Sequence, residues 1–167
     1  NDNDGKIISK TTLDSINICH YVHNEIGIIQ NLQERDINNF LFSDISQAIG
    51  KIPFSFQDFD PDIAIISCHK FGGSPSVGLL YLKDPSVWIQ PDIGSRYMQD
   101  CSGTMDTVAI EQSCMALEQA LLTLPQRTIN MLEFQETLET GLEELGFKII
   151  GKEHNRCPNV SFICTPN

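Results

Sequence analysis

Short apolar runs alternate with polar stretches through the first half of the chain. The runs are rich in β-branched and aromatic residues and cover 15–22 (SINICHYV), 40–44 (FLFSD), 62–68 (DIAIISC) and 77–84 (VGLLYLKD). Runs of this length and composition are typical of strands in a buried parallel sheet. The polar stretch at 31–39 predicts a short crossover helix, because parallel strands cannot be joined by a tight turn.

The second half of the chain changes to a helical period. Apolar positions in 106–124 recur at spacings close to that of a helix, and Pro125 is expected to end this helix. Residues 127–147 predict a second amphipathic helix, with Gly146 as its terminator. The chain therefore combines strands and helices in an α/β arrangement.

Two short apolar segments, 148–151 (KIIG) and 159–164 (NVSFIC), follow the helices and read as strands. The change from a sheet-forming part to a smaller helix-and-strand part falls at Pro125 and Gln126. We therefore expect two domains, covering 1–125 and 126–167.

The amino-acid composition and net charge argue against some classes of binding partner. The chain has 167 residues, 41% hydrophobic and 20% charged, with a formal net charge of −11. This acidic balance argues against nucleic acid and anionic membranes, which bind basic surfaces. The polar opening NDNDGKIISK resembles no signal peptide, and no apolar run could span a bilayer. We expect a cytoplasmic protein.

The cysteines suggest neither a disulfide framework nor a zinc finger, since no CxxC pair occurs. Two adjacent pairs, Cys19 with His20 and Cys68 with His69, could join His23 as metal ligands. Isolated cysteines on strands are more often small core residues, so no metal site is predicted. We expect reduced thiols at all six positions: Cys19, Cys68, Cys101, Cys114, Cys157 and Cys164.

Polar side chains cluster after three of the predicted strands. Ligands of α/β sheets bind where loops leave the carboxyl ends of strands. An amine, a carboxylate and several hydrogen-bond donors at such an edge are what a pyridoxal phosphate site requires. The candidates are His23, Asn24 and Glu25 after the first strand, Asp44 and Gln47 after the second, and Ser67, His69 and Lys70 after the third.

Each candidate also has a purely structural explanation. Asp44 could cap a helix formed by ISQAIGK, and Lys70 could be a solvated loop lysine. Asn24 could be a turn residue, Glu25 a surface charge, and Ser67 and His69 polar groups satisfied beside a turn. The combination of residues, more than any one of them, favours a site.

Four segments resemble the cysteine desulfurases, members of the class V aminotransferase superfamily of fold-type I pyridoxal phosphate enzymes. They are HNEIGIIQ (23–30), SDISQAIGKIP (43–53), SCHKFGG (67–73) and CSGTMDTVAI (101–110), of which NEIG is the most family-specific. The resemblance implies that 1–125 is the central and C-terminal part of the large cofactor-binding domain, with a mainly parallel sheet. Residues 126–167 would begin the small α+β domain.

The resemblance also implies roles for individual residues. Lys70 would hold the cofactor covalently and shuttle protons, and Asp44 would keep the pyridine nitrogen protonated. Gln47 and Asn24 match positions that contact the cofactor ring, Ser67 and His69 match phosphate ligands, and Thr104 matches a threonine that reaches the phosphate of a neighbouring subunit in a homodimer.

The implied reaction removes sulfur from L-cysteine, giving L-alanine and an enzyme persulfide. The sulfur would pass to an acceptor such as an iron–sulfur scaffold protein, or serve in tRNA thiolation. None of the six cysteines aligns with the sulfur-carrying residue, although Cys68 lies close to Lys70 in sequence.

Several departures from the family pattern point to low activity. The resemblance covers nearly the whole chain, yet the chain matches less than half of such an enzyme. Cys101 stands where an arginine is expected, the glycine-rich loop before it is altered, and GGSPSVG replaces the usual loop after Lys70. We expect little or no turnover from the isolated chain. The alternatives are a degenerate, non-catalytic relative that acts in dimerisation or partner binding, and another class V enzyme such as a selenocysteine lyase.

Overall fold

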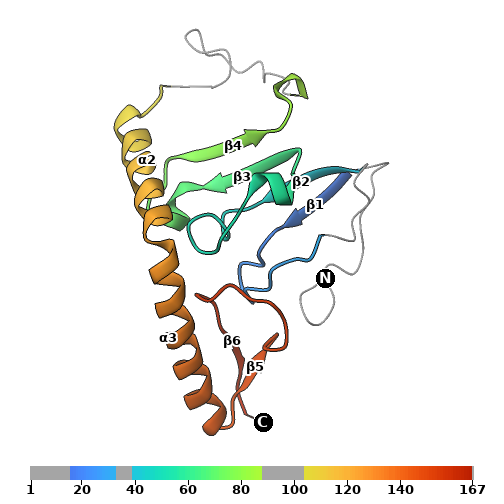
Figure 1. Cartoon of the computed structure of the whole chain (residues 1–167), viewed down its shortest axis with the longest axis vertical. Helices are drawn as coiled ribbons and strands as arrows, with labels where there is room; N and C mark the ends of the chain where they lie inside the picture. The colour runs from blue at the N-terminus through green and yellow to red at the C-terminus, as the bar shows by residue number, and fades with distance from the viewer. Residues whose placement is uncertain (1–15, 33–38, 88–103, 167) are drawn as a thin grey trace.

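The first half of the chain forms a four-stranded sheet. The computed structural model describes residues 16–32, 39–87 and 104–166. The sheet has the order β1 (Ile16–His20), β2 (Phe40–Asp44), β3 (Ile63–Ser67) and β4 (Gly78–Leu82) (Figure 1). The first three strands are parallel, as predicted, whereas β4 is antiparallel to β3. The connection 68–77 is too short for a crossover, so the chain must turn back.

Burial follows position in the sheet. The inner strands β2 and β3 alternate between buried and partly buried residues, and Leu41 and Ala64 are fully buried. The prediction of buried strands is wrong for the two edges: Ile18 on β1 is 69% exposed, and the first half of β4 is exposed. An edge strand has a neighbour on one side only, which leaves its apolar side chains uncovered in this chain.

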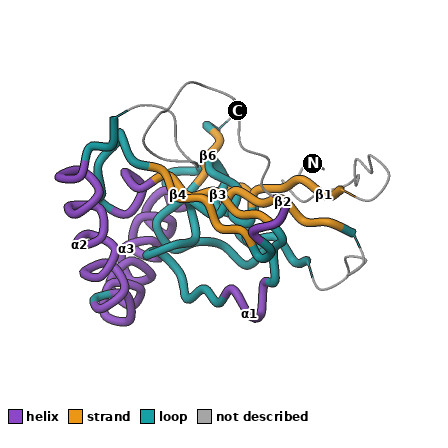
Figure 2. The backbone as a smooth tube through the Cα atoms, turned by 90° about the horizontal axis from the view of Figure 1, so that it is seen from above, coloured by secondary structure: helices purple, strands orange, loops and turns teal. Residues whose placement is uncertain are grey.

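Two helices follow the sheet, α2 (Thr107–Leu122) and α3 (Leu124–Glu144). They continue one after the other along one side of the molecule (Figure 1), and Figure 2 shows them gathered beside the sheet. The side chain of Asp106 begins α2 by accepting a hydrogen bond from the amide of Ala109, 3.0 Å away. Ala120 of α2 packs into the core formed by the sheet.

Pro125 does not end α2, contrary to the sequence-based prediction. The break falls at Thr123, and Pro125 lies in the first turn of α3. Proline is tolerated there because the first amides of a helix have no acceptor within it. At the other end, α3 stops just before Gly146, whose φ of 86° suits glycine, so the predicted terminator is confirmed.

The chain ends in a small antiparallel hairpin of β5 (Lys148–Ile150) and β6 (Phe162–Cys164). Both strands were expected, although β6 is shorter than the predicted segment 159–164. Residues 33–38 of the predicted crossover helix lie outside the described residues. The division into domains at residue 125 stays a prediction.

The described residues also include the short helical segments α1 (Phe56–Phe59), η1 (Cys68–Phe71) and η2 (Pro85–Val87). The segment 45–51, considered above as a helix capped by Asp44, forms a series of turns instead. In the part of the chain that is described, no helix combines the length and apolarity needed to cross a membrane.

Candidate functional site

The predicted site residues gather where β1, β2 and β3 end. The register pairs His20 with Asp44 across the first two strands, and Asp44 with Ile65 across the next two. Backbone hydrogen bonds continue this pairing past the strand ends, from Tyr21 to the carbonyl of Asp44 and from Ile45 to that of Ile65, each at 3.0 Å. The loops that carry the polar side chains therefore leave from one edge of the sheet.

The two carboxylate oxygens of Asp44 have different surroundings. Oδ1 accepts a hydrogen bond from the amide of Ser46 at 2.8 Å, which closes the turn after β2. Oδ2 lies 3.8 Å from Nδ1 of His20, too far for a hydrogen bond. The Asp44 side chain is 30% exposed, so Oδ2 can still accept a hydrogen bond from a group outside the chain.

The turn that carries Gln47 is tied to the loop after β3. The hydroxyl of Ser46 accepts a hydrogen bond from the amide of Ser67 at 2.8 Å. Gln47 lies on the same turn, and its amide oxygen accepts a hydrogen bond from the ammonium group of Lys51. The strand-end loops of β2 and β3 are thus held together directly, which fixes the relative positions of Gln47 and Ser67.

His69 and Lys70 are exposed on η1, immediately after β3. Their neighbours Cys68 and Phe71 are buried and anchor this short helix to the core. The alternation gives η1 one buried side and one exposed side. Lys70 makes no hydrogen bond or ion pair with any residue in the described ranges, so its amine is available to a ligand.

The loop after Lys70 packs closely on α2. A Cβ atom added to Gly73 would lie 2.9 Å from Cβ of Cys68 and 3.0 Å from Oγ of Ser113. Ser113 donates a hydrogen bond to the carbonyl of Ala109 and accepts one from the amide of Ser74. Only glycine fits at position 73, and the contact with α2 determines how the Lys70 segment is held.

Cys68 is unsuited to act as a nucleophile. It is the first residue of η1, and its side chain is fully buried in the core. Burial raises the pKa of the thiol, an effect that the hydrogen bond with Ser113 only partly offsets. The residue serves as a small core side chain, the role that the sequence favoured.

Asn24 belongs to a tight turn between β1 and the core residue Ile28. The amide of Gly27 donates to the carbonyl of His23 at 2.9 Å, and that of His23 donates to Ile28 at the same distance. Gly27 has a φ of 73° and lies against Val160, so a Cβ atom there would come within 2.8 Å of Cβ of Val160. Asn24 itself is exposed at the tip.

Two further predictions concern Thr104 and Cys101. Thr104 is exposed before α2, and no hydrogen bond joins its side chain to another residue in the described ranges. Its expected role concerns a neighbouring subunit, so the role stays a prediction. Cys101, which replaces an expected arginine, lies outside the described residues.

Sequence reasoning missed three residues that support the site: Ser46, Lys51 and Ser113. Ser46 and Ser113 act through hydroxyl contacts between segments far apart in the sequence, and no local pattern announces them. Lys51 had a usable signal, because it follows Gln47 by four residues, a spacing at which side chains on a turn can meet. No group of three or more His, Cys, Asp or Glu side chains suited to a metal ion occurs within the described ranges.

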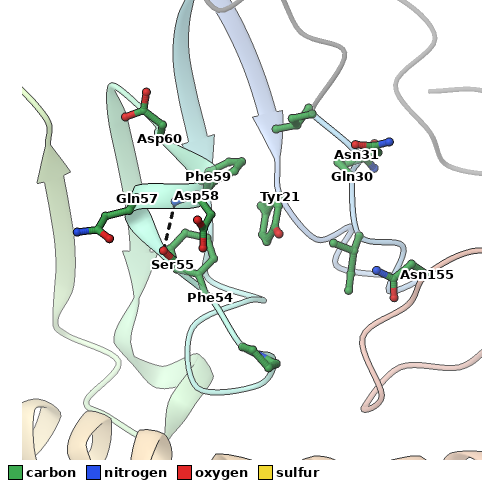
Figure 3. A pocket seen from close by; sticks show the side chains of 13 residues that line it. Tyr21, Gln30, Asn31, Phe54, Ser55, Gln57, Asp58, Phe59, Asp60 and Asn155 are labelled. Atoms are coloured by element: carbon green, nitrogen blue, oxygen red, sulfur yellow. Dashed lines mark hydrogen bonds between the residues drawn. The ribbon is translucent and has the colours of Figure 1, made fainter.

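A separate cavity of about 760 Å³ lies between the loop after β1 and the segment around α1 (Figure 3). Tyr21, Phe54 and Phe59 form an aromatic cluster along it, with ring centroids 4.4–5.5 Å apart. Burial, and secondarily the charge of Asp58, raise the pKa of the Tyr21 hydroxyl. None of the predicted site residues lines this cavity.

Comparison with known proteins shows that the chain is similar to class V aminotransferases, including cysteine desulfurases. The family model described as "Aminotransferase class-V" matches residues 4–155. The protein "Cysteine desulfurase IscS" of Rickettsia massiliae (strain Mtu5) is 38% identical over 130 residues, which are 73% of this chain and 31% of that protein. The chain therefore spans about a third of the length of this curated relative.

Solved structures show the same likeness. A structure titled "NIFS-LIKE PROTEIN" matches with a TM-score of 0.82 and 30% identity, over 91% of this chain and 44% of that one. The NifS-like protein from Rickettsia africae ESF-5 matches with a TM-score of 0.78 and 26% identity, with the same coverage. The mixed, mostly parallel sheet with its helices is thus part of the α/β fold of these proteins, as the sequence predicted.

Proposed function

Because the chain belongs to the class V aminotransferase family, we propose that it carries part of the pyridoxal 5'-phosphate site of a cysteine desulfurase. The observation that supports this most directly is the placement of Asp44 and Lys70. They follow neighbouring parallel strands and leave from the same edge of the sheet. A carboxylate and an amine at such an edge are the two groups that pyridoxal phosphate chemistry needs from its protein.

The donor set of this edge fits the cofactor. Oδ2 of Asp44 lies beyond hydrogen-bond range of His20 and can accept a hydrogen bond from a protonated pyridine nitrogen. The exposed amine of Lys70 can form a covalent link with an aldehyde. The hydroxyl of Ser67 and the imidazole of His69 would hold the phosphate, and Asn24 and Gln47 would contact the ring.

Pyridoxal phosphate, when bound, supplies an electron-accepting ring that weakens bonds at the substrate Cα. Asp44 would keep the ring nitrogen protonated, and Lys70 would carry protons between its Nζ atom and the substrate. The proposed substrate is L-cysteine, which loses sulfur to give L-alanine. A cysteine thiolate would attack the substrate sulfur as its bond to Cβ breaks, so that the sulfur is held as a persulfide on that cysteine. It would then pass to an acceptor such as an iron–sulfur scaffold protein, or serve in tRNA thiolation.

The sulfur-carrying cysteine is not provided by the buried thiols of this chain. Cys68 and Cys157 are 0% and 1% exposed, and burial raises the pKa of both. Cys164 is exposed but lies on strand β6, not on a loop. These observations argue against Cys68 and Cys157 as the sulfur carrier.

Association with a second chain is part of the proposal. Large apolar side chains are exposed on the helices, among them Leu122 on α2 and Phe134 on α3, which are 79% and 71% exposed. Such exposure is typical of surfaces that another protein covers. We propose a homodimer in which Thr104 reaches the partner's phosphate site. These surfaces equally suit the alternative of a non-catalytic relative that acts in dimerisation, and a cytoplasmic location remains an expectation.

The decisive experiment is covalent trapping of the cofactor. The purified chain is mixed with pyridoxal phosphate, reduced with borohydride and mapped by mass spectrometry. A matched pair of variants, Lys70→Ala and Lys148→Ala, separates the site from the surface, since both lysines are exposed. We expect a pyridoxyl adduct at Lys70 that only Lys70→Ala abolishes. Labelling spread over surface lysines, or none, would contradict the proposal and favour the non-catalytic alternative.

A further inference from the structure

Lys51 is a half-buried lysine that the proposed reaction does not use. It ends the turn after β2 and donates a hydrogen bond from Nζ to Oε1 of Gln47. Exposed surface lysines keep their ammonium groups in water, where hydration is strongest. The Lys51 ammonium group instead makes a hydrogen bond with the side-chain amide of a neighbouring residue. We therefore consider what this contact does to that amide.

The surroundings of Lys51 show that the turn is held from several sides. Arg127 of α3 donates a hydrogen bond to the carbonyl of Gly50. The thiol of Cys157 lies 3.8 Å from the carbonyl of Gln47. Burial lowers the pKa of the Lys51 ammonium, and the nearby positive charges of Lys70 and Arg127 lower it further, against the opposing effect of Cys157. Lys51 therefore lies within electrostatic reach of the lysine that the proposed reaction uses.

The contact between Lys51 and Gln47 decides the orientation of the Gln47 amide. An ammonium group has only donors, so it can pair with the amide oxygen and is repelled by the amide NH₂. Rotation of the amide by 180° would place two donor groups against each other. With Oε1 held by Lys51, the NH₂ group is the part of Gln47 left for a ligand.

We propose that Lys51 is a positioning residue, which holds Oε1 of Gln47 so that the Gln47 NH₂ group donates to an oxygen of the cofactor ring. This inference rests on the proposed function, in which Gln47 contacts that ring. It adds that the Lys51 ammonium group determines which end of the Gln47 amide faces the ring. Without Lys51, Gln47 could present either end of its amide.

The orientation is tested first on the chain without cofactor. The side-chain NH₂ resonances of Gln47 are observed by NMR in ¹⁵N-labelled protein and assigned by their loss in Gln47→Glu. Lys51→Met removes the donor and keeps the length of the side chain, whereas Lys51→Arg keeps a donor. We expect the Gln47 resonances of Lys51→Met to move to the positions of a solvated glutamine, and those of Lys51→Arg to stay near wild type. Unchanged resonances in Lys51→Met would overturn the inference.

The consequence for the cofactor is tested by titration with pyridoxal phosphate, followed by visible absorption. We expect Lys51→Met to bind about fivefold to tenfold more weakly, the effect of losing one oriented hydrogen bond, and Lys51→Arg to recover most of that loss. Gln47→Glu retains an acceptor for Lys51 but has no NH₂ group, and should weaken binding at least as much. Wild-type affinity in Lys51→Met or in Gln47→Glu would overturn the inference.

Failure of the proposed function gives a different result. A wild-type chain that binds no pyridoxal phosphate would refute the cofactor role of this chain and, with it, the donation to the ring. Unfolding midpoints in urea, measured for every variant, confirm that the comparison is made between folded proteins.

Discussion

Arg156 and Glu139 form a buried ion pair between the segment before β6 and helix α3. The guanidinium nitrogens Nη1 and Nη2 lie 2.8 and 2.9 Å from the two carboxylate oxygens, and the side chains are 8% and 5% exposed. Ser161 adds a hydrogen bond to the same carboxylate at 2.6 Å. Because Ile28 is bridged to Arg156, this pair also links α3 to the turn that carries Asn24.

Removal of one partner of this pair should destabilise the fold strongly. Arg156→Met leaves the Glu139 carboxylate buried without its cation, and we expect a loss of about 3 kcal/mol in the free energy of unfolding. The double variant Arg156→Met with Glu139→Leu removes both charges and should recover part of that loss. Urea denaturation measures both, and a double variant as unstable as the single one would contradict this explanation.

The same pair predicts how stability depends on pH. Burial alone would raise the pKa of Glu139, but the hydrogen bonds from Arg156 and Ser161 outweigh it and hold the pKa below its ordinary value of 4.5. Between the lowered pKa of the folded chain and the ordinary pKa of the unfolded chain, the unfolded chain binds more protons than the folded chain. The free energy of unfolding therefore falls as the pH is lowered. The stabilisation is complete above the ordinary value and is lost as the pH falls through the lowered one.

Glu139→Gln supplies the control for this pH dependence. Other carboxylates titrate in both proteins. The quantity to compare is therefore the difference between their free energies of unfolding, measured at pH 6 and below. We expect wild type to lose its advantage over Glu139→Gln in acid. A difference that does not change with pH would show that Glu139 keeps an unperturbed pKa.

Two glycine substitutions should have opposite effects. In Gly73→Ala the added Cβ atom would meet Cys68 and Ser113 at 2.9–3.0 Å, so the segment after Lys70 must shift. We expect a loss of about 1–3 kcal/mol, as for other overpacked positions. Gly141 lies exposed within α3 with no atom near its Cβ position, and Gly141→Ala should stabilise the helix by about 0.5–1 kcal/mol. Thermal unfolding of both variants tests whether close packing, and not glycine as such, is required at position 73.

Asp44 allows its structural and proposed chemical roles to be separated. Asp44→Asn keeps an oxygen that can accept from the Ser46 amide, whereas Asp44→Ala removes it. We expect Asp44→Asn to unfold within about 0.5 kcal/mol of wild type, and Asp44→Ala to lose about 1 kcal/mol. If Asp44 also keeps the cofactor nitrogen protonated, both variants should lose the wild-type visible spectrum with pyridoxal phosphate. A wild-type spectrum in Asp44→Asn would assign Asp44 to the turn alone.

The sequence determined the local elements and the residue types of the candidate site. Apolar runs predicted the strands, because residues such as Leu41 and Ala64 must leave water. Strand-end positions predicted that Asp44, Ser67 and Lys70 share one edge, since the ends of parallel strands meet there. These are properties of short segments, and they depend directly on the local order of polar and apolar residues.

Tertiary structure decided the contacts that join segments far apart in the sequence. The pairs Ser46 with Ser67, Ser74 with Ser113 and Arg156 with Glu139 form only when whole elements are packed, and each residue alone is compatible with an exposed loop. Edge exposure of β1 and the antiparallel direction of β4 also depend on neighbours and loop lengths. Polarity along the chain therefore specified which segments form elements and which groups lie at their ends, whereas long-range packing determined how the segments that carry Gln47 and Lys70 are held against their neighbours.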